Sequence, residues 1–354
     1  MKQKSLAYLS YLTLIHKSHY MRIYQYLLFG CLVLELMSSC SKTPEPKILD
    51  GSAQGTYYHI SFYADDTLGV ANSIDSIFIA IDNSLSLWRE KSIINAVNAN
   101  QDPILDSIFI QNFISAKKFY QLTDGAFDIT IGSLVKSYGF TTEKRKVLSE
   151  KQIDSLLKIS GMDKISLQDS HLYKKYPEIQ LDFNAIAQGY TSDAIAKLFR
   201  KRGIDSFVID VGGEVMCGNE KPNGKAWSVG IERPTETKDE QIGKSIAQVY
   251  LKNHAIVTSG NYRKYYIVNG VKYSHTIDPK TGHPVQHNLL SASVIASDAT
   301  SADALATAFM VMGLEKTQKF LQSHSEYAAY LIYSDKNGQM KTWQSPNFGQ
   351  YLNK

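Results

Sequence analysis

The sequence predicts an α+β fold in one domain that spans residues 48–350. Three observations lead to this prediction. Strand-like and helical segments follow one another without the regular strand–helix alternation of a parallel α/β protein. No internal repeat, low-complexity tract or Gly/Ser-rich linker divides residues 48–350. Of the 354 residues, 44% are hydrophobic and 20% are charged, a balance that argues against a disordered or polytopic membrane protein.

Two kinds of residue pattern locate the elements. Short runs rich in β-branched and aromatic residues, bounded by Gly, Asn or Asp, predict strands, and apolar residues at intervals of three and four predict helices. Asn269-Gly270 between two such runs predicts a hairpin turn. The expected strands are Thr56–Tyr63, Ile179–Phe183, Ser206–Val211, Trp227–Ile231, Ala247–Leu251, Ile256–Thr258, Tyr265–Val268, Val271–Tyr273 and Leu290–Ala296. The expected helices are Asn72–Ser86, Pro103–Thr123, Glu150–Ile159, Ala187–Arg202, Ala302–Met312 and Glu315–Gln322.

The charge balance and the missing motifs exclude several function classes. A total of 38 Lys and Arg against 34 Asp and Glu gives a formal charge of +4, too mild an excess to suggest nucleic-acid binding. Three cysteines are too few for a disulfide framework. We find no G-x-G-x-x-G, Walker-type, H-E-x-x-H, G-x-S-x-G or C-x-x-C motif. The usual nucleotide-binding, zinc-protease, serine-hydrolase and thiol-redox classes therefore have no motif support.

Residues 1–40 have the pattern of a signal peptide that ends in a lipobox. A basic start at Met21-Arg22 precedes a mostly apolar run, Ile23–Met37, and small residues precede Cys40. The run is too short and too interrupted for a good membrane-spanning helix. Cys40 is the predicted lipidation site and mature N-terminus; an uncleaved anchor, or a chance cysteine in a signal peptide, is the alternative. Met21 is an alternative start, and residues 41–47 predict a tether.

Asp303 and Thr307 are the first candidate site residues. They are four apart in an Ala-rich helical segment, so they lie one above the other on the same helical face. A carboxylate and a hydroxyl in this arrangement offer two hard oxygen donors to Mg²⁺. The alternative is an ordinary helix N-terminus, in which Asp303 interacts with the helix dipole and Thr307 bonds back to the preceding turn.

Two further segments carry polar residues at ends of predicted elements. Asp182 stands where an apolar run gives way to a helix, whose N-terminus is a natural anion site; the alternative is a simple helix cap. His275 and Asp278 flank an apolar residue beside the turn-forming Asp-Pro-Lys-Thr-Gly stretch. Histidine suits proton transfer near neutral pH, although a lone histidine is more often a structural hydrogen-bonding group.

Glycine-containing turns and one tryptophan complete the candidates. The turns at Thr123–Thr130 and Asp210–Glu214 would let a ligand approach the backbone, or they are plain turns. Trp88 follows a predicted helix. Its ring would either stack on an aromatic ligand or fill the core.

Taken in order, these segments resemble the ApbE family of FAD:protein FMN transferases, over roughly residues 48–345. The set is specific because many short motifs recur in one order. They are Gly55-Thr56, Ile81-Asp82 through Ser86 and Trp88, Asp124–Thr130, Leu181-Asp182 to Gly189-Tyr190, Gly212-Gly213-Glu214, Thr258–Tyr262, His275–Gly282 and Ala302–Thr307. The resemblance implies an ApbE-like, T-fold-related domain with mixed, largely antiparallel sheets and packed helices.

The resemblance also implies roles for individual residues. Mg²⁺ would be held by the backbone oxygen of Ala185 and the side chains of Asp303 and Thr307. His275 would lie nearest the reacting hydroxyl. From the residues themselves we expect His275 to take the proton, with Asp278 or Asp182 as a second catalytic residue. FAD would contact Gln54, Trp88, Ala126, Phe127, Asp128, Asp182, Gln188 and Ile277. Gln54 and Gln188 depart from the Met and Lys that many members carry, and a glutamine brings hydrogen bonds but no charge.

The implied function is Mg²⁺-dependent transfer of FMN from FAD to a Ser or Thr hydroxyl of a target protein, with release of AMP. The implied partners are flavin-accepting subunits of membrane electron-transport complexes. The implied location is the periplasmic side of a bacterial membrane, held by the lipid on Cys40, with the inner membrane favoured over the outer one. A non-catalytic FAD-binding lipoprotein and a Mg²⁺-dependent FAD pyrophosphatase are the alternatives.

Overall fold

The computed structural model describes residues 44–140, 146–234, 245–261, 265–268 and 271–352. The chain divides into two compact units, Met1–Pro44 and Glu45–Lys354, and every element below belongs to the second. The predicted signal segment with Cys40, and the predicted turn at Asn269-Gly270, lie outside the described residues. Among the described helices, none has the length and apolar character needed to cross a membrane.

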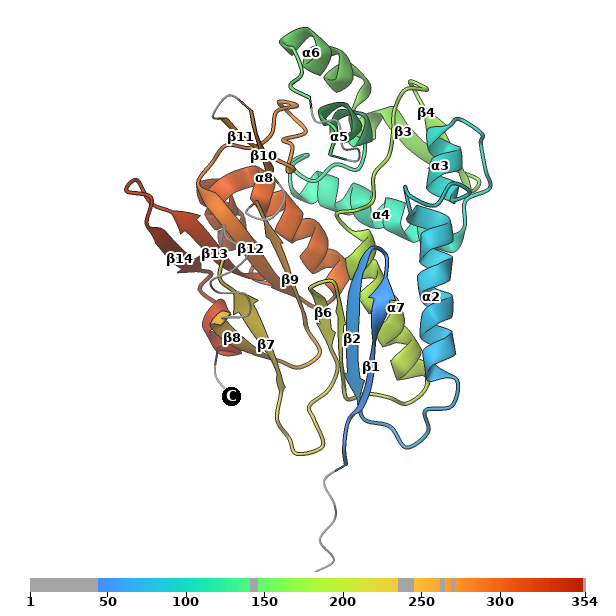
Figure 1. Cartoon of the computed structure of the whole chain (residues 1–354), viewed down its shortest axis with the longest axis vertical. Helices are drawn as coiled ribbons and strands as arrows, with labels where there is room; N and C mark the ends of the chain where they lie inside the picture. The colour runs from blue at the N-terminus through green and yellow to red at the C-terminus, as the bar shows by residue number, and fades with distance from the viewer. Residues whose placement is uncertain (1–43, 141–145, 235–244, 262–264, 269–270, 353–354) are drawn as a thin grey trace, which may run out of the picture. The chain divides into compact units, whose positions relative to one another are not determined.

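An eight-stranded sheet organises the Glu45–Lys354 unit, with strand order β1-β2-β5-β6-β9-β12-β13-β14 (Figure 1). Every neighbouring pair in it is antiparallel. Its strands are β1 (Lys47–Ala53), β2 (Thr56–Phe62), β5 (Phe207–Val211), β6 (Glu214–Cys217), β9 (Ala255–Gly260), β12 (Leu289–Ala296), β13 (Ala328–Ser334) and β14 (Met340–Gln344). Three strand pairs stand beside it: β3 (Ile165–Gln168) with β4 (His171–Lys174), β7 (Trp227–Glu232) with β8 (Ser245–Leu251), and β10 (Tyr265–Val268) with β11 (Val271–Ser274). The α+β prediction is confirmed.

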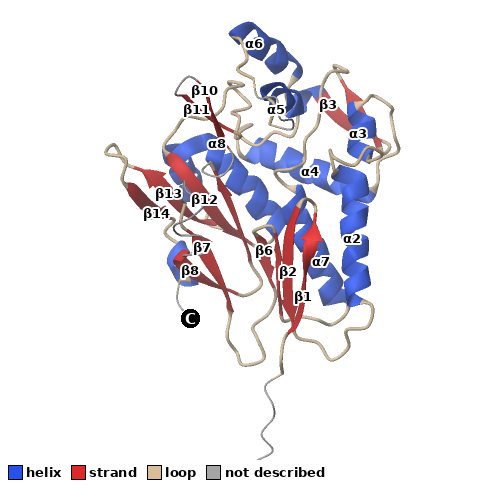
Figure 2. Ribbon diagram, viewed as in Figure 1, coloured by secondary structure: helices blue, strands red, loops and turns tan. Residues whose placement is uncertain are grey.

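Helices α7 and α8 pack on one face of the sheet, and α2 and α4 pack against those two helices (Figure 2). This face holds the larger core, in which Ile209 and Val294 of the sheet meet Phe199 and Phe309 of the helices. Strands β7 and β8 contribute to a smaller core that includes Ile256 and Ile295. The helices are α2 (Val70–Leu85), α3 (Ile93–Asn98), α4 (Ser107–Leu122), α5 (Gly132–Tyr138), α6 (Glu150–Ile159), α7 (Ala187–Lys201) and α8 (Ala299–Ser323), with short 3₁₀ turns at Met162–Lys164 and Phe348–Tyr351.

The helices expected at Ala302–Met312 and Glu315–Gln322 lie on either side of a kink at Gly313. Helix α8 joins the segments predicted at Ala302–Met312 and Glu315–Gln322, and its backbone leaves the helical conformation only at Gly313, with φ 76° and ψ −178°. A positive φ favours glycine, which has no Cβ to clash. Gly313 falls in the gap between the two expected helices and marks the kink between the two halves of α8.

The strand expected at Ile179–Phe183 is wrong. Only Gln180 makes a ladder contact, an isolated parallel bridge with Ile131. The side chain of Asn98 occupies both backbone groups of Leu181, accepting from its N–H at 2.7 Å and donating to its carbonyl at 3.0 Å. The residues on either side of Leu181 bond to the 129–132 segment, where the Gly132 N–H donates to the Gln180 carbonyl and the Asp182 N–H donates to the Ile129 carbonyl. The segment therefore pairs locally and joins none of the sheets.

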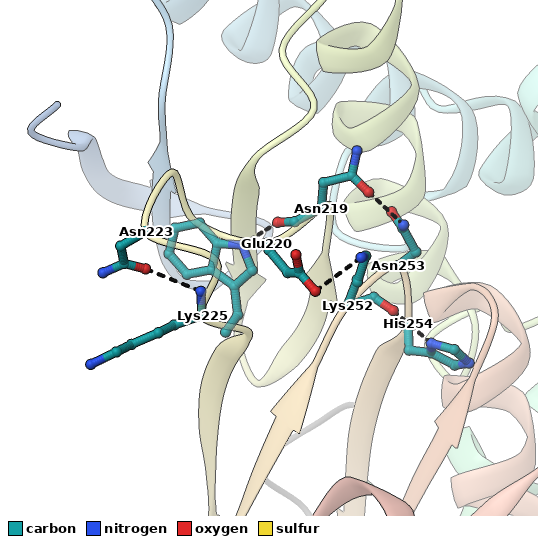
Figure 3. Close-up of polar contacts among 8 residues, drawn as sticks. Asn219, Glu220, Asn223, Lys225, Lys252, Asn253 and His254 are labelled. Atoms are coloured by element: carbon teal, nitrogen blue, oxygen red, sulfur yellow. Dashed lines mark hydrogen bonds and ion pairs between the residues drawn. The ribbon is translucent and has the colours of Figure 1, made fainter. Parts of the chain in front are cut away.

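A polar corner lies at the start of β9, which we define as Asn219–Lys225 together with Lys252–His254 (Figure 3). Lys252 pairs with Glu220 at 2.9 Å, and Asn253 donates to the Asn219 side chain at 2.7 Å. The indole N–H of Trp227 donates to the Asn219 carbonyl at 2.9 Å. The corner joins the β6–β7 and β8–β9 connections.

Candidate active site

Helices α7 and α8 touch at Gly189. Its backbone N–H donates to Asp303 Oδ2 at 3.1 Å. A Cβ at this position would collide with the Ala299 carbonyl oxygen and lie 2.8 Å from the Asp303 Cβ. Only glycine therefore allows the first turns of the two helices to approach this closely, which brings a carboxylate of α8 against the backbone of α7.

Asp303 and Thr307 lie on the inner side of α8. The Asp303 side chain is only 4% exposed, and Thr307 Oγ1 lies 3.3 Å from Ser259 Oγ at the end of β9. Burial raises the pKa of Asp303 to about 7, against the lowering effect of the Gly189 N–H; the nearby Asp193 carboxylate raises it further. A cation beside Asp303 would favour its ionised form.

Ala185 occupies a tight turn that leads into α7. Asp182 opens this turn, and its Oδ1 accepts the Asn184 N–H at 2.8 Å. The Phe183 carbonyl then accepts from Ile186 and Ala187. Burial raises the pKa of Asp182, which the bond from Asn184 partly offsets. The Ala185 carbonyl, the Thr307 hydroxyl and the Asp303 carboxylate all offer hard oxygen donors, the ligand type that Mg²⁺ prefers.

The Ala126–Asp128 turn lies beside the Asp182 segment, because the Asp182 N–H donates to the Ile129 carbonyl at 2.8 Å. Thr123 Oγ1 accepts the Phe127 N–H at 3.0 Å, and Asp128 Oδ1 accepts from the N–H and hydroxyl of Thr130 at 2.8 and 2.7 Å. Burial raises the pKa of Asp128 to about 6 despite these hydrogen bonds. Ala126 and Phe127 are buried.

Two glutamines link the start of α7 to turns of the sheet: Gln54 from the β1–β2 turn, and Gln188, which belongs to the first turn of α7 itself. Gln54, in the β1–β2 turn with φ 53°, donates through Nε2 to Thr191 Oγ1 at 3.0 Å. A Cβ on Gly212 would lie 3.0 Å from Gln188 Nε2, so Gln188 lies against the β5–β6 turn. The structure thus brings Gln54 and Asp303 to the first two turns of α7, the helix that carries Gln188.

The His275–Asp278 segment forms a separate wall. Ile277 is buried among Leu134, Tyr138 and Ile153, and His275 is half-buried. Asp278 Oδ1 accepts the Lys280 N–H at 2.8 Å, so this carboxylate organises its own turn. Lys280 in turn pairs with Asp124, which connects the segment to the Ala126–Asp128 turn.

Trp88 is 71% exposed, in the connection between α2 and α3. That exposure excludes the core-filling alternative and leaves a ring face available to a ligand. A cavity of about 350 Å³ includes Asp128 alone of the predicted FAD-contact residues. Its remaining lining residues are Tyr120, Gln121, Asp124, Gly125, Ser160, Gly161, Asp163, Lys164, Pro279 and Lys280.

Sequence reasoning missed Asp193. Its two oxygens accept the backbone N–H groups of Ala299 and Thr300 at 2.8 Å each, so it caps α8 from the middle of α7. Burial raises its pKa to about 6. The sequence did offer a signal for Asp193, because it is an acidic residue on the inner side of a predicted amphipathic helix. Within the described residues, no three His, Cys, Asp or Glu side chains gather around a metal-sized site, and the expected Mg²⁺ donors include only one such residue.

Comparison with known proteins places the fold and these segments in one family. Residues 54–331 match the model of the ApbE family. The FAD:protein FMN transferase of Escherichia coli K12 is 33% identical over 338 residues, which cover 88% of this chain and 93% of that protein. The structure of the flavin transferase ApbE from Vibrio cholerae superposes with a TM-score of 0.77 at 27% identity, covering 87% of this chain and 99% of that one. The apo flavinyl transferase ApbE of Pseudomonas stutzeri gives 0.78 at 27% identity, covering 87% and 97%. The chain belongs to the ApbE family.

Proposed function

We propose that this chain is a Mg²⁺-dependent FAD:protein FMN transferase. It moves FMN from FAD to a Ser or Thr hydroxyl of a target protein and releases AMP. The observation that carries the proposal is the meeting of the buried Asp303 carboxylate, Gln188 and the Asp182 turn at the start of α7. Family membership supports the same activity, because relatives over most of the chain are FAD:protein FMN transferases.

Asp303, Thr307 and the Ala185 carbonyl would hold Mg²⁺. These donors are all oxygen, and burial disfavours an ionised Asp303 without a compensating cation. Held by these donors, a Mg²⁺ ion would supply positive charge to balance that of the FAD pyrophosphate. Gly189 orients the Asp303 carboxylate by donating its N–H to Oδ2. Oδ1 would then be the oxygen that binds the metal.

FAD would lie along the walls that the site residues form. Gln54 and Gln188 offer amide groups near the helix start, and the exposed ring of Trp88 offers a stacking face. The Ala126-Phe127-Asp128 turn, Asp182 and the apolar side chain of Ile277 complete the contacts. None of these FAD-contact residues carries a positive charge, so the proposed metal would supply most of the charge that balances the phosphates.

His275 would accept the proton of the target hydroxyl. The hydroxyl oxygen forms a bond to the FMN-side phosphorus while the bond from that phosphorus to the AMP oxygen breaks. His275 holds the released proton on a ring nitrogen. Asp278 would support this wall through its turn, since its Oδ1 accepts the Lys280 N–H.

The proposed setting is the periplasmic side of a bacterial membrane, favouring the inner one. The basic and apolar segment before Cys40 supports export and lipidation of that cysteine. Flavin-accepting subunits of membrane electron-transport complexes are the proposed targets. Mass spectrometry of the mature N-terminus tests this part: a diacylglyceryl-cysteine at Cys40 is expected, and an unmodified or uncleaved N-terminus would refute it.

Incubation with FAD, Mg²⁺ and a target domain, followed by intact mass measurement, tests the activity. Covalent FMN on the target is the expected product. Free FMN with AMP would instead indicate a pyrophosphatase, and unchanged FAD would indicate a binding protein. His275→Ala should abolish transfer while Mg²⁺ still raises the melting temperature. Transfer at the wild-type rate would refute the proposed role of His275.

A further inference from the structure

Asn261 follows the last residue of β9 and is held by the sheet. Its backbone N–H donates to the Leu290 carbonyl at 3.0 Å, which continues the pairing of β9 with β12 beyond Gly260. The residue is 8% exposed. Its backbone is therefore fixed to the central sheet before its side chain makes any contact.

The Asn261 side chain binds the residues on both sides of His275. Its Oδ1 accepts the Ser274 hydroxyl at 2.6 Å and the Thr276 hydroxyl at 2.7 Å. The Thr276 N–H also donates to Ser274 Oγ at 3.1 Å, which closes the loop on itself. A carbonyl oxygen has two lone pairs, so these two hydroxyls use its full accepting capacity.

We propose that Asn261 is a positioning residue for His275. Fixing the chain at 274 and at 276 restricts the backbone dihedrals of the residue between them, and these dihedrals set the direction of the imidazole. This inference rests on the proposed function, in which His275 accepts the proton of the target hydroxyl. Asn261 acts through the loop, by way of the Ser274 and Thr276 hydroxyls.

The same strand end also contacts the metal-binding helix. Ser259 lies two residues before Asn261, and side chains two apart point to the same face of a strand. Ser259 Oγ lies 3.3 Å from Thr307 Oγ1 of α8. One rigid strand therefore carries the contact to α8 and the clamp on the His275 loop, so the sheet sets the spacing between the base and the proposed Mg²⁺ donors.

Asn261→Ala removes the acceptor and tests the proposal. A misplaced base lowers the chemical step more than substrate binding, so kcat should fall roughly 10- to 100-fold with KM for FAD changed less than about threefold. Asn261→Asp keeps an oxygen acceptor and adds a negative charge near the loop. It should recover part of kcat, and the acidic limb of the pH–rate profile should move to higher pH.

Asn347→Ala is the matched control. Asn347 also accepts a serine hydroxyl, that of Ser345 at 2.6 Å, and donates to the Ser325 and Tyr327 carbonyls at 2.8 and 2.9 Å. It lies beyond β14, among none of the site residues. Its replacement should lower the melting temperature and leave the pH–rate profile unchanged.

An NMR titration of the His275 ring, assigned with His275→Gln, separates the two proposals. In Asn261→Ala the His275 resonance should shift or broaden, whereas in Asn347→Ala it should not. If the wild type forms no covalent FMN, the proposed function fails while the ring resonance still tests the clamp. If Asn261→Ala keeps the wild-type kcat, pH profile and His275 resonance, Asn261 does not position His275.

Discussion

The two ends of β9 are both polar, but they differ in burial. At its start, Lys252 and Glu220 form an ion pair with side chains 50% and 43% exposed. At its end, Asn261 and its partner Ser274 are 8% and 3% exposed. Water competes with the first set of contacts and is excluded from most of the second. Polar contacts of similar length therefore differ in what they do: the buried ones hold the geometry at the end of the strand, whereas the exposed ones at its start add little to stability.

The strongest test of this comparison is at the buried end, where α8 faces β9. Asp303→Asn keeps an oxygen that accepts the Gly189 N–H but removes the charge that the proposed Mg²⁺ needs. Transfer should fall at least about 100-fold. Mg²⁺ should no longer raise the melting temperature, while the metal-free melting temperature at pH 8 should equal or exceed that of the wild type. Intact mass and thermal unfolding measure these effects.

Asp106→Asn is the control for Asp303→Asn. Asp106 is a structural carboxylate, which caps α4 by accepting the Phe109 N–H at 2.8 Å. Asparagine keeps the capping oxygen, so this replacement should change stability little and keep the Mg²⁺ response. A Mg²⁺ response that survives in Asp303→Asn would place the metal elsewhere.

The buried carboxylates also predict how stability depends on pH. Burial raises the folded-state pKa of Asp128 and Asp193 to about 6 and of Asp303 to about 7, from an ordinary value of 3.8. The folded state therefore binds more protons than the unfolded state between about pH 4 and pH 7, and stability falls as pH rises through that window. Without Mg²⁺, the free energy of unfolding should drop by on the order of a few kcal/mol from pH 5 to pH 8.

Urea denaturation at pH 5 and pH 8 measures this drop. Mg²⁺ should reduce it, because a cation favours ionised Asp303. Asp193→Asn should make the dependence shallower. A metal-free protein that becomes more stable between pH 5 and pH 8 would contradict the prediction.

The smallest effect is expected at the exposed end of β9. Lys252→Met removes the ion pair with Glu220 in the polar corner. Exposed pairs contribute about 0–1 kcal/mol, so the free energy of unfolding should change by no more than that, and transfer should be unaffected. A larger loss of stability, or a loss of transfer, would show that the two ends of β9 are not as different as their burial indicates.

The sequence predicted well those elements whose conformation follows from local residue patterns. Glu150–Ile159 was predicted from apolar spacing and is α6 in the structure. Strand β13 was missed, although Tyr330-Leu331-Ile332-Tyr333 has the aromatic and β-branched content of a strand; it pairs with β12 and β14. The predicted strand at Ile179–Phe183 failed because the Asn98 side chain takes up both backbone groups of Leu181, in the middle of the segment.

The site residues divide in the same way. The four-residue spacing of Asp303 and Thr307 was visible in the sequence, but the contact of Asp303 with Gly189 joins residues 114 positions apart. The capping role of Asp193 and the clamp of Asn261 likewise depend on tertiary contacts. Sequence reasoning from residue types finds groups that bear the chemistry more readily than the groups that hold them in place.

Strand β9 is therefore a part of the chain that should tolerate substitution better than a change in length. Because strand side chains alternate between faces, deleting one residue between Ala255 and Ser259 would turn Ser259 and Asn261 toward the β7–β8 side. The connections at its start, in the polar corner, have no such constraint. During divergence of the family, insertions and deletions should therefore collect in the Asn219–Lys225 loop, while the number of residues from Ala255 to Asn261 stays constant.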